Sequence, residues 1–203
     1  MTRPTKDMSL SARAQQFSAL IGRSEITDAN GSVLDLEAGM NAVCEVLSEA
    51  RNNRSTVFVI GNGGSAAIAS HAVIDFVNVA KLRAFTMHEP SVLTCIANDY
   101  GYEYSYSRLL EQMAKPGDVL IAISSSGRSP NIRNAAAQVA NIGGKVITLS
   151  GFLHDNPLRT RGLLNIWLDA SDYGLVEVGH QFILHNVSDR FGTGYGSSGS
   201  SKA

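Results

Sequence analysis

The sequence predicts an α/β protein with a doubly wound parallel sheet, and two observations predict it. Four short runs of mostly β-branched and aliphatic residues lack polar alternation, which is typical of strands buried on both faces of a parallel sheet. Stretches with apolar residues at helical spacing lie between these runs, and such mixing of strands and helices is the pattern of a doubly wound sheet. With 203 residues and 44% hydrophobic composition, the chain can bury one full core.

We expect two helices ahead of the first strand. Apolar residues recur at helical spacing from about residue 9 to 21 and from about residue 32 to 51. Their apolar stripe has no sheet of its own, which favours an assembly surface. We therefore divide the chain into an N-terminal helical extension (1–31), an α/β domain (32–191) and a Gly/Ser tail (192–203) that we expect to be flexible.

The remaining elements follow along the chain. The expected strands are Thr56–Ile60, Val119–Ile123, Lys145–Leu149 and Leu163–Leu168, and the expected helices are Ala66–Ala80, Glu103–Ala114, Asn131–Asn141 and Leu175–Phe191. In an open α/β sheet, ligands bind in the crevice at the carboxyl ends of the strands. The loops that follow the strands are therefore where we expect a site.

The composition argues against two classes of partner. Lys and Arg number 17 and Asp and Glu 18, so a net charge of −1 supplies no field that attracts nucleic acid or an anionic membrane. Cys44 and Cys95 are too few for a disulfide framework or a thiolate zinc cluster, and their apolar surroundings are typical of buried free thiols. With no apolar leader and no 18-residue apolar run, we expect a cytoplasmic protein.

The first candidate phosphate loop follows the first buried strand. It reads Gly61-Asn62-Gly63-Gly64-Ser65 and runs into an Ala-rich helix, so main-chain N–H groups and a helix N-terminus can face an anion. Its spacing is neither the G-x-G-x-x-G of dinucleotide-binding proteins nor the Gly-Lys-Ser/Thr of ATP-binding loops. The alternative interpretation is a tight turn that binds nothing.

The second candidate loop follows the strand Val119–Ile123 and is rich in hydroxyl groups. It carries four serines within six residues, namely Ser124, Ser125, Ser126 and Ser129. Ser129 is a candidate N-cap and Pro130 the first helical residue, which leaves hydroxyl and free N–H groups directed at one spot. Such neutral donors can hold a phosphate monoester dianion without clustered Lys or Arg. The alternatives are an ordinary Ser-rich loop and, for Arg128, a solvated side chain rather than a phosphate ligand.

Ionisable side chains on two predicted helices form a candidate metal site. His71 and Asp75 are four residues apart and share one helix face. Glu177 and His185, eight residues apart, lie about 80° apart around the last helix and could bracket the same site. Two imidazoles and two carboxylates suit zinc, which as a Lewis acid would polarise a carbonyl. The alternative is a solvated helix face or a packed pair. For His180, on the same last helix, the two interpretations are a packing histidine and a support for the site.

Together these motifs resemble one family. The Gly-Asn-Gly-Gly-Ser loop, a Ser-x-Ser-Gly-x-Ser loop and the intervening Asn98-Asp99-Tyr100-Gly101 are similar to the sugar isomerase (SIS) family over about residues 32–191, and among its members to the phosphoheptose isomerases. The resemblance implies a flavodoxin-like topology, a homotetramer and a zinc cofactor. It also implies interconversion of sedoheptulose 7-phosphate and D-glycero-D-manno-heptose 7-phosphate, in heptose biosynthesis for lipopolysaccharide or other cell-surface polysaccharide precursors.

The same resemblance implies roles for individual residues. The substrate-binding residues would be Asn62, Gly63, Gly64, Ser65, Asn98, Asp99, Ser124, Ser125, Ser126 and Ser129. The metal ligands would be His71, Asp75, Glu177 and His185. We expect His185 to be the general acid or base, with Asp75 or Glu177 as its partner.

Three departures from the family pattern leave alternatives open. Asp75 stands where the family usually has Glu, Glu177 where it usually has Gln, and the segment Gly151–Arg159 replaces a usual Gly-Gly pair. An altered segment could reshape the sugar pocket, so an isomerase of another phosphosugar is one alternative. A non-catalytic phosphosugar-binding or partner-binding module is the other. The ionisable residues that the chain retains favour catalysis.

Overall fold

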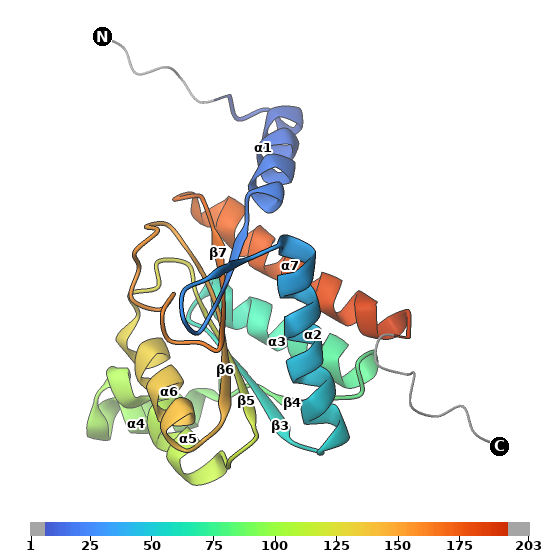
Figure 1. Cartoon of the computed structure of the whole chain (residues 1–203). Helices are drawn as coiled ribbons and strands as arrows, with labels where there is room; N and C mark the ends of the chain where they lie inside the picture. Colours follow the sequence, from blue (N-terminus) through green and yellow to red (C-terminus); the bar gives the residue numbers. More distant parts are fainter. Residues whose placement is uncertain (1–6, 195–203) are drawn as a thin grey trace, which may run out of the picture.

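The computed structural model describes residues 7–194, and within them it contains one seven-stranded sheet with helices on both faces (Figure 1). The strands lie in the order β2-β1-β7-β6-β5-β3-β4. Their bounds are β1 Glu25–Asp28, β2 Val33–Leu34, β3 Thr56–Ile60, β4 Arg83–Phe85, β5 Val119–Ser124, β6 Lys145–Gly151 and β7 Leu164–Leu168.

The parallel part of the sheet confirms the predicted doubly wound topology. β3 pairs with β4 on one side and with β5 on the other, and β6 and β7 continue outward from β5. Numbered among themselves, these parallel strands have the flavodoxin-like order 2-1-3-4-5. The order reverses between β3 and β5, where Ile60 lies opposite Ala122. The crevice at such a reversal point is where ligands of these folds bind.

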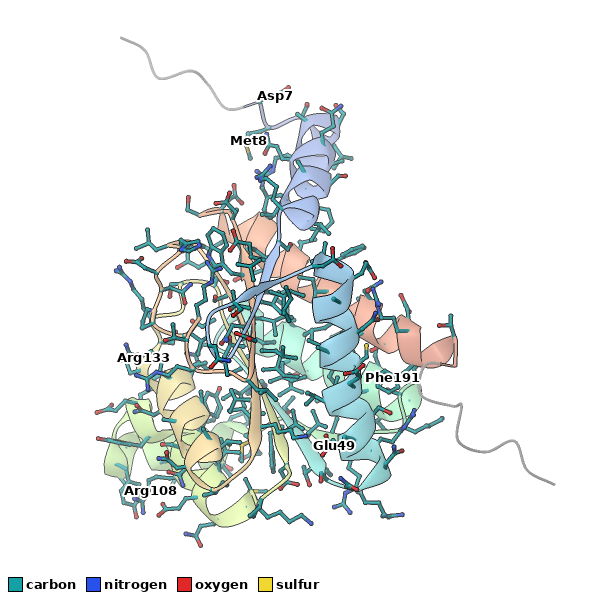
Figure 2. The ribbon with its side chains drawn as sticks, in the orientation of Figure 1. Asp7, Met8, Glu49, Arg108, Arg133 and Phe191 are labelled. Atoms are coloured by element: carbon teal, nitrogen blue, oxygen red, sulfur yellow. The ribbon has the colours of Figure 1, made fainter. Side chains whose placement is uncertain are left out.

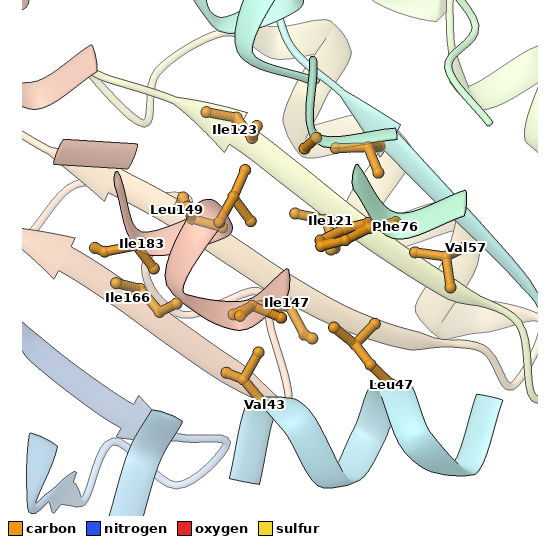
Figure 3. Packing of buried hydrophobic residues seen from close by; sticks show 14 of the residues in the cluster. Val43, Leu47, Val57, Phe76, Ile121, Ile123, Ile147, Leu149, Ile166 and Ile183 are labelled. Atoms are coloured by element: carbon orange, nitrogen blue, oxygen red, sulfur yellow. The ribbon is translucent and has the colours of Figure 1, made fainter. Parts of the chain in front are cut away.

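Three long helices bury one face of the sheet: α2 (Leu36–Asn52), α3 (Gly64–Asn78) and α7 (Tyr173–Gly192). In Figure 3, Leu47 of α2 and Phe76 of α3 point toward the strands, and both side chains are fully buried. Burial of a side chain of this size contributes roughly 1.5–3 kcal/mol. This layer fixes where α3 and α7 lie on the sheet.

The opposite face is covered by shorter helices. α5 (Ser107–Met113) and α6 (Pro130–Asn141) pack on it, and α4 (Pro90–Tyr100) with the 3-10 helix η1 (Tyr102–Tyr104) lies beside them (Figure 1). The helix expected over Glu103–Ala114 therefore begins later, after η1. The strand β4 and the helix α4 were not predicted.

The N-terminal part differs from the prediction. α1 (Leu10–Gly22) and α2 are helices as expected, but the hairpin β1–β2 lies between them and extends the sheet beside β7. Asp28 Oδ1 accepts hydrogen bonds from the N–H groups of Asn30 and Ser32, and Gly31 has a φ of 82°. The Asn-Gly pair is a hairpin signal that could have revealed these strands. The expectation that both helices precede the first strand is wrong, because β1 pairs with β7 and β2 pairs with β1.

The two cysteines have different environments. Cys44 is fully buried in α2, and burial raises the pKa of its thiol to about 11. Cys95 is exposed on α4, a helix with no buried residues. The prediction of a buried thiol is therefore wrong for Cys95, because apolar neighbours in the sequence do not bury a helix that lies at the surface.

Side-chain contacts attach α2 to its neighbours. Glu49 of α2 pairs with Lys145 at the start of β6, and the Arg51 guanidinium lies 4.9 Å from the centre of the Phe191 ring (Figure 2). Beyond α7, the expected flexible tail lies, from residue 195 on, outside the described residues. In residues 7–194, no helix combines the length and apolar character needed to cross a membrane.

Candidate functional site

The two predicted phosphate loops line one cavity at the reversal point of the sheet. The first loop, Gly61–Ser65, follows β3 and ends in the first two residues of α3. The second, Ser124–Ser129, begins at the last residue of β5 and ends at the N-cap of α6. The cavity has a volume of about 280 Å³. It is lined by Asn62, Gly63, Gly64, Ser65, Ile123, Ser124, Ser125, Ser126, Ser129, Tyr173 and Glu177. The fold thus brings together every residue of the two loops that we expected to bind substrate.

The main chain opens the first loop toward the cavity. Gly63, the N-cap of α3, has φ 54° and ψ −122°, a conformation that glycine adopts most easily. No side chain caps the helix, and the N–H groups of Ser65 and Ala66 donate to the carbonyls of Asn62 and Gly63. Among the described residues the N–H of Gly64 has no acceptor, so it is left for an anion. Gly61 is needed for a different reason, because a Cβ there would lie 2.5 Å from the carbonyl carbon of Ser65.

The second loop supplies hydroxyl donors. Ser124 Oγ donates to Ser129 Oγ at 3.2 Å, and Ser125 Oγ is buried without a hydrogen-bond partner among the described residues. Ser129 is the N-cap of α6, with no side-chain cap bond, and Pro130 occupies the first turn as predicted. A buried hydroxyl without a partner costs about 1–3 kcal/mol. An anion that accepts from Ser125 would remove this cost.

The segment Gly151–Arg159, which departs from the family pattern, packs behind the serine loop Ser124–Ser129. A Cβ on Gly127, whose φ is 64°, would lie 1.8 Å from Asn156 Oδ1. Asn156 Nδ2 is held in turn by Ser150 Oγ and by the carbonyls of Gly151 and Leu153, at 2.9–3.1 Å. No residue of the segment contributes to the cavity lining.

A second polar group lies between α3 and α7. His71, Asp75 and His185 have candidate ligand atoms within 4.8 Å of one another. Asp75 Oδ2 lies 3.5 Å from His71 Nε2 and 3.0 Å from His185 Nδ1. These contacts lack hydrogen-bond geometry, so the buried Oδ2 has no hydrogen bond. Two imidazole nitrogens around an unsatisfied carboxylate oxygen fit a zinc ion, which favours such N and O ligands.

The register of α3 against α7 separates Glu177 from this group. Gly64 packs against the Glu177 carboxylate, and Asp75 further along α3 packs against His185 further along α7, so the helices run parallel. The eight residues from Glu177 to His185 correspond to a rise of about 12 Å. The structure therefore places the Glu177 carboxylate at the cavity and not among His71, Asp75 and His185.

Comparisons with known proteins decide the family. A sequence model of the SIS domain matches residues 26–151. The chain is 36% identical over 168 residues to a phosphoheptose isomerase of Geotalea daltonii, which covers 76% of this chain and 83% of the relative. This chain belongs to the phosphoheptose isomerase family. A second relative, a phosphoheptose isomerase of Campylobacter concisus, is 33% identical over 162 residues, covering 76% of this chain and 84% of the relative.

The fold agrees with that family. The solved structure of the phosphoheptose isomerase from Neisseria gonorrhoeae matches with a TM-score of 0.76 and 23% identity. The match covers 91% of this chain and 97% of the other. The flavodoxin-like sheet, with its helices on both faces, is therefore the fold that the two proteins share.

Two residues that the phosphoheptose isomerase resemblance assigns to the sugar lie elsewhere. Asn98 and Asp99 are exposed on α4, where Asn98 Nδ2 donates to Asp99 Oδ1 at 2.9 Å. Cys95 Sγ lies 3.5 Å from the other oxygen of Asp99. Neither residue is part of the cavity lining formed by this one chain.

Four side chains at or beside the cavity were not predicted. Tyr173 lines the cavity, and Tyr102, Tyr106 and Asn131 contact the first loop. Tyr106 OH donates to the Gly61 carbonyl at 2.7 Å, and burial raises the pKa of this phenol. Only Asn131 gave a signal in the sequence, since it follows the serine loop directly, whereas the tyrosines come from segments without a motif.

Two histidines outside the metal group have lowered pKa values. His180 is fully buried, and this burial lowers its pKa to about 4, although a contact of 3.1 Å between Nε2 and the Ser150 carbonyl partly opposes the shift. His88 is half-buried, and burial lowers its pKa as well. The neutral His180 packs between α7 and β6.

Proposed function

We propose that this chain is an aldose–ketose isomerase that interconverts sedoheptulose 7-phosphate and D-glycero-D-manno-heptose 7-phosphate, supplying heptose for cell-surface polysaccharide precursors. The observation that carries the proposal is the pairing of a serine-lined cavity with the group His71, Asp75 and His185 along the same two helices. Membership of the phosphoheptose isomerase family supports the same reaction.

The spacing of the two parts suits a seven-carbon sugar phosphate. Glu177 at the cavity and His185 lie about 12 Å apart along α7. A chain extended from phosphorus through seven carbons spans about 10 Å at ordinary bond lengths. With its phosphate held by the two loops, such a substrate would bring carbons 1 and 2 to the His71, Asp75 and His185 group.

The reaction moves one proton between carbons 1 and 2 and one between their oxygens. Starting from the ketose, a base removes a proton from carbon 1 to give an enediol, and protonation of carbon 2 then leaves the carbonyl on carbon 1. We assign His185 as the general acid or base, with Asp75 as its partner; Glu177, the other partner expected from the sequence, lies at the cavity, about 12 Å from His185 along α7. The distance of 3.0 Å between His185 Nδ1 and Asp75 Oδ2 supports this, because it brings the imidazole and the carboxylate within reach of the same reacting atoms. Zinc held by His71, Asp75 and His185 would supply Lewis-acid polarisation of the substrate carbonyl, whereas the Glu177 carboxylate, which we expected as a fourth ligand, lies at the cavity.

We also propose a cytoplasmic homotetramer with shared active sites. Large apolar side chains that are about half exposed support an assembly surface on α3 and α7, among them Ile74, Val178 and Phe182. In such an assembly, Asn98 and Asp99 on the exposed α4 would meet the sugar hydroxyls of a substrate held by a neighbouring subunit.

A coupled assay on metal-stripped protein, with and without restored zinc, tests the function. Zinc-dependent turnover of sedoheptulose 7-phosphate is the expected result. Saturable sugar-phosphate binding without turnover would instead favour another phosphosugar or a non-catalytic binding module. Full activity in His185→Ala would refute the acid–base assignment. His154→Ala, which removes a histidine whose side chain is 68% exposed, is the control and should keep wild-type turnover.

A further inference from the structure

An amide pair ties the two loops of the cavity together. Asn62 Nδ2 donates to Asn131 Oδ1 and Asn131 Nδ2 donates to Asn62 Oδ1, both at 2.9 Å. Asn62 belongs to the loop after β3, and Asn131 is the second residue of α6, directly behind the serine loop. The pair therefore bridges the crevice at which the strand order reverses.

Asn131 is held in one orientation. It is 1% exposed, its Oδ1 also accepts from the N–H of Ile132 at 3.0 Å, and its Nδ2 also donates to Ser105 Oγ at 3.2 Å. Because a main-chain N–H can only donate, the Ile132 contact fixes which end of the amide is oxygen. A buried amide whose partners are all present makes a rigid support.

The side-chain oxygen of Asn62 is fully used by the protein. It accepts from Asn131 and also from Tyr102 OH, at 2.9 Å each. A carbonyl oxygen has two lone pairs, so both are occupied. Asn62 therefore presents its main chain, and not its side-chain oxygen, to a ligand in the cavity.

We propose that Asn131 is a positioning residue for phosphate binding. Acting through Asn62, it sets the separation of the two loops so that the N–H groups of one and the hydroxyls of the other converge on a single phosphate. Asn131 does not itself line the cavity, so its effect is on geometry alone. The inference rests on the proposed function only in taking this cavity as the phosphate site.

Calorimetric titration with inorganic phosphate tests the role of the Asn62–Asn131 pair, the tie between the two loops. This measurement does not depend on isomerase activity. Asn131→Ala and Asn62→Ala should each weaken phosphate binding by about tenfold, the scale of one or two lost hydrogen bonds. The double variant should be no weaker than either single one, because each side chain acts through the other. Additive losses, or a Kd in Asn131→Ala within twofold of wild type, would overturn the proposal.

Steady-state kinetics separates positioning from general damage. The two loops should bind the phosphate equally tightly in the substrate and in the transition state. A change that weakens this binding therefore raises KM and leaves kcat almost unaltered. A rise of about tenfold in KM at unchanged kcat is thus expected for Asn131→Ala, whereas a fall in kcat alone would mean partial unfolding and would contradict the proposal. Asn134→Ala is the matched control, since within residues 7–194 this amide on α6 donates only to the Glu103 carbonyl, and it should bind phosphate like wild type.

The outcomes distinguish this inference from the proposed function. Wild-type protein that binds phosphate but does not isomerise the sugar phosphate contradicts the proposed function and leaves the tie standing. Wild-type protein that isomerises the sugar while Asn131→Ala binds phosphate normally contradicts the tie alone. Absence of phosphate binding by the wild type would overturn both.

Discussion

Acid is expected to destabilise this protein through His180. In the folded chain burial lowers the pKa of His180 to about 4, whereas in the unfolded chain its pKa is near the ordinary 6.5. Between these values the unfolded chain binds more protons than the folded chain. Stability that depends on neutral His180 is therefore fully present above pH 6.5 and is lost as the pH falls toward 4.

The size of the effect follows from the two pKa values. At about 1.4 kcal/mol for each tenfold change in proton affinity, the full loss is about 3 kcal/mol, of which about 2 kcal/mol is lost by pH 5. Domains of this kind are stable by roughly 5–15 kcal/mol, so the loss is measurable. With an m-value of about 2 kcal/mol/M, the urea midpoint at pH 5 should fall by about 1 M.

Urea unfolding of wild type and His180→Gln at pH 8 and pH 5 measures this loss. All samples contain a chelator, so that metal release does not add to the pH dependence. Gln keeps a donor for the Ser150 carbonyl and does not titrate, so the variant should lose about 2 kcal/mol less than wild type between the two pH values. His154→Gln changes an exposed histidine and should behave like wild type. Equal losses in wild type and His180→Gln would refute the reasoning.

Three further substitutions test the site. Gly64→Ala places a Cβ 2.4 Å from Glu177 Oε2, so the carboxylate must move, and kcat/KM for the sugar phosphate should fall by roughly tenfold or more. Asp75→Asn keeps the shape of the side chain but removes a charged ligand, so zinc retained after dialysis, measured by atomic absorption, should fall well below that of wild type. Gly127→Ala combines a positive φ with a contact of 1.8 Å to Asn156 Oδ1, and should lower the free energy of unfolding in urea by about 2–3 kcal/mol.

Other glycines supply matched controls for these substitutions. Gly22→Ala meets no atom within 4 Å and should leave turnover unchanged, in contrast to Gly64→Ala. Gly117 has a φ of 86° but only one neighbouring atom, at 3.6 Å, so Gly117→Ala measures the backbone strain alone. If it destabilises as much as Gly127→Ala, the contact with Asn156 contributes nothing.

The parallel core of the fold could be predicted because buried strands have a local signal. Val57–Ile60 and Val119–Ile123 are continuous apolar runs, and their side chains are buried on both faces of the sheet. β4 has no such signal, since it is three residues long at an edge and only Ala84 of the three is buried. The hairpin β1–β2 had one, the Asn-Gly turn, but its strands were too short for a periodicity to emerge.

The site could be predicted only where a residue's place in the site follows directly from its position along the chain. The loop residues lie as expected because a loop's place is set by the strand before it. The tie between Asn62 and Asn131 joins residues 69 apart, which no local pattern encodes. Angular spacing on one helix placed Glu177 and His185 on adjoining faces, but it contains no information about which residue of α3 lies opposite each of them.

The packing of Asn156 against Gly127 has a consequence for which part of the molecule would affect phosphate binding and which would affect the choice of sugar. The segment Gly151–Arg159 supports the serine loop from behind, so we expect its replacement to alter phosphate binding rather than the choice of sugar. Under the proposed function, discrimination by carbon-chain length would instead depend on the distance along α7 between the two loops and His185. A protein engineer seeking activity on shorter sugars would therefore redesign the interface of α3 and α7 and leave this segment intact.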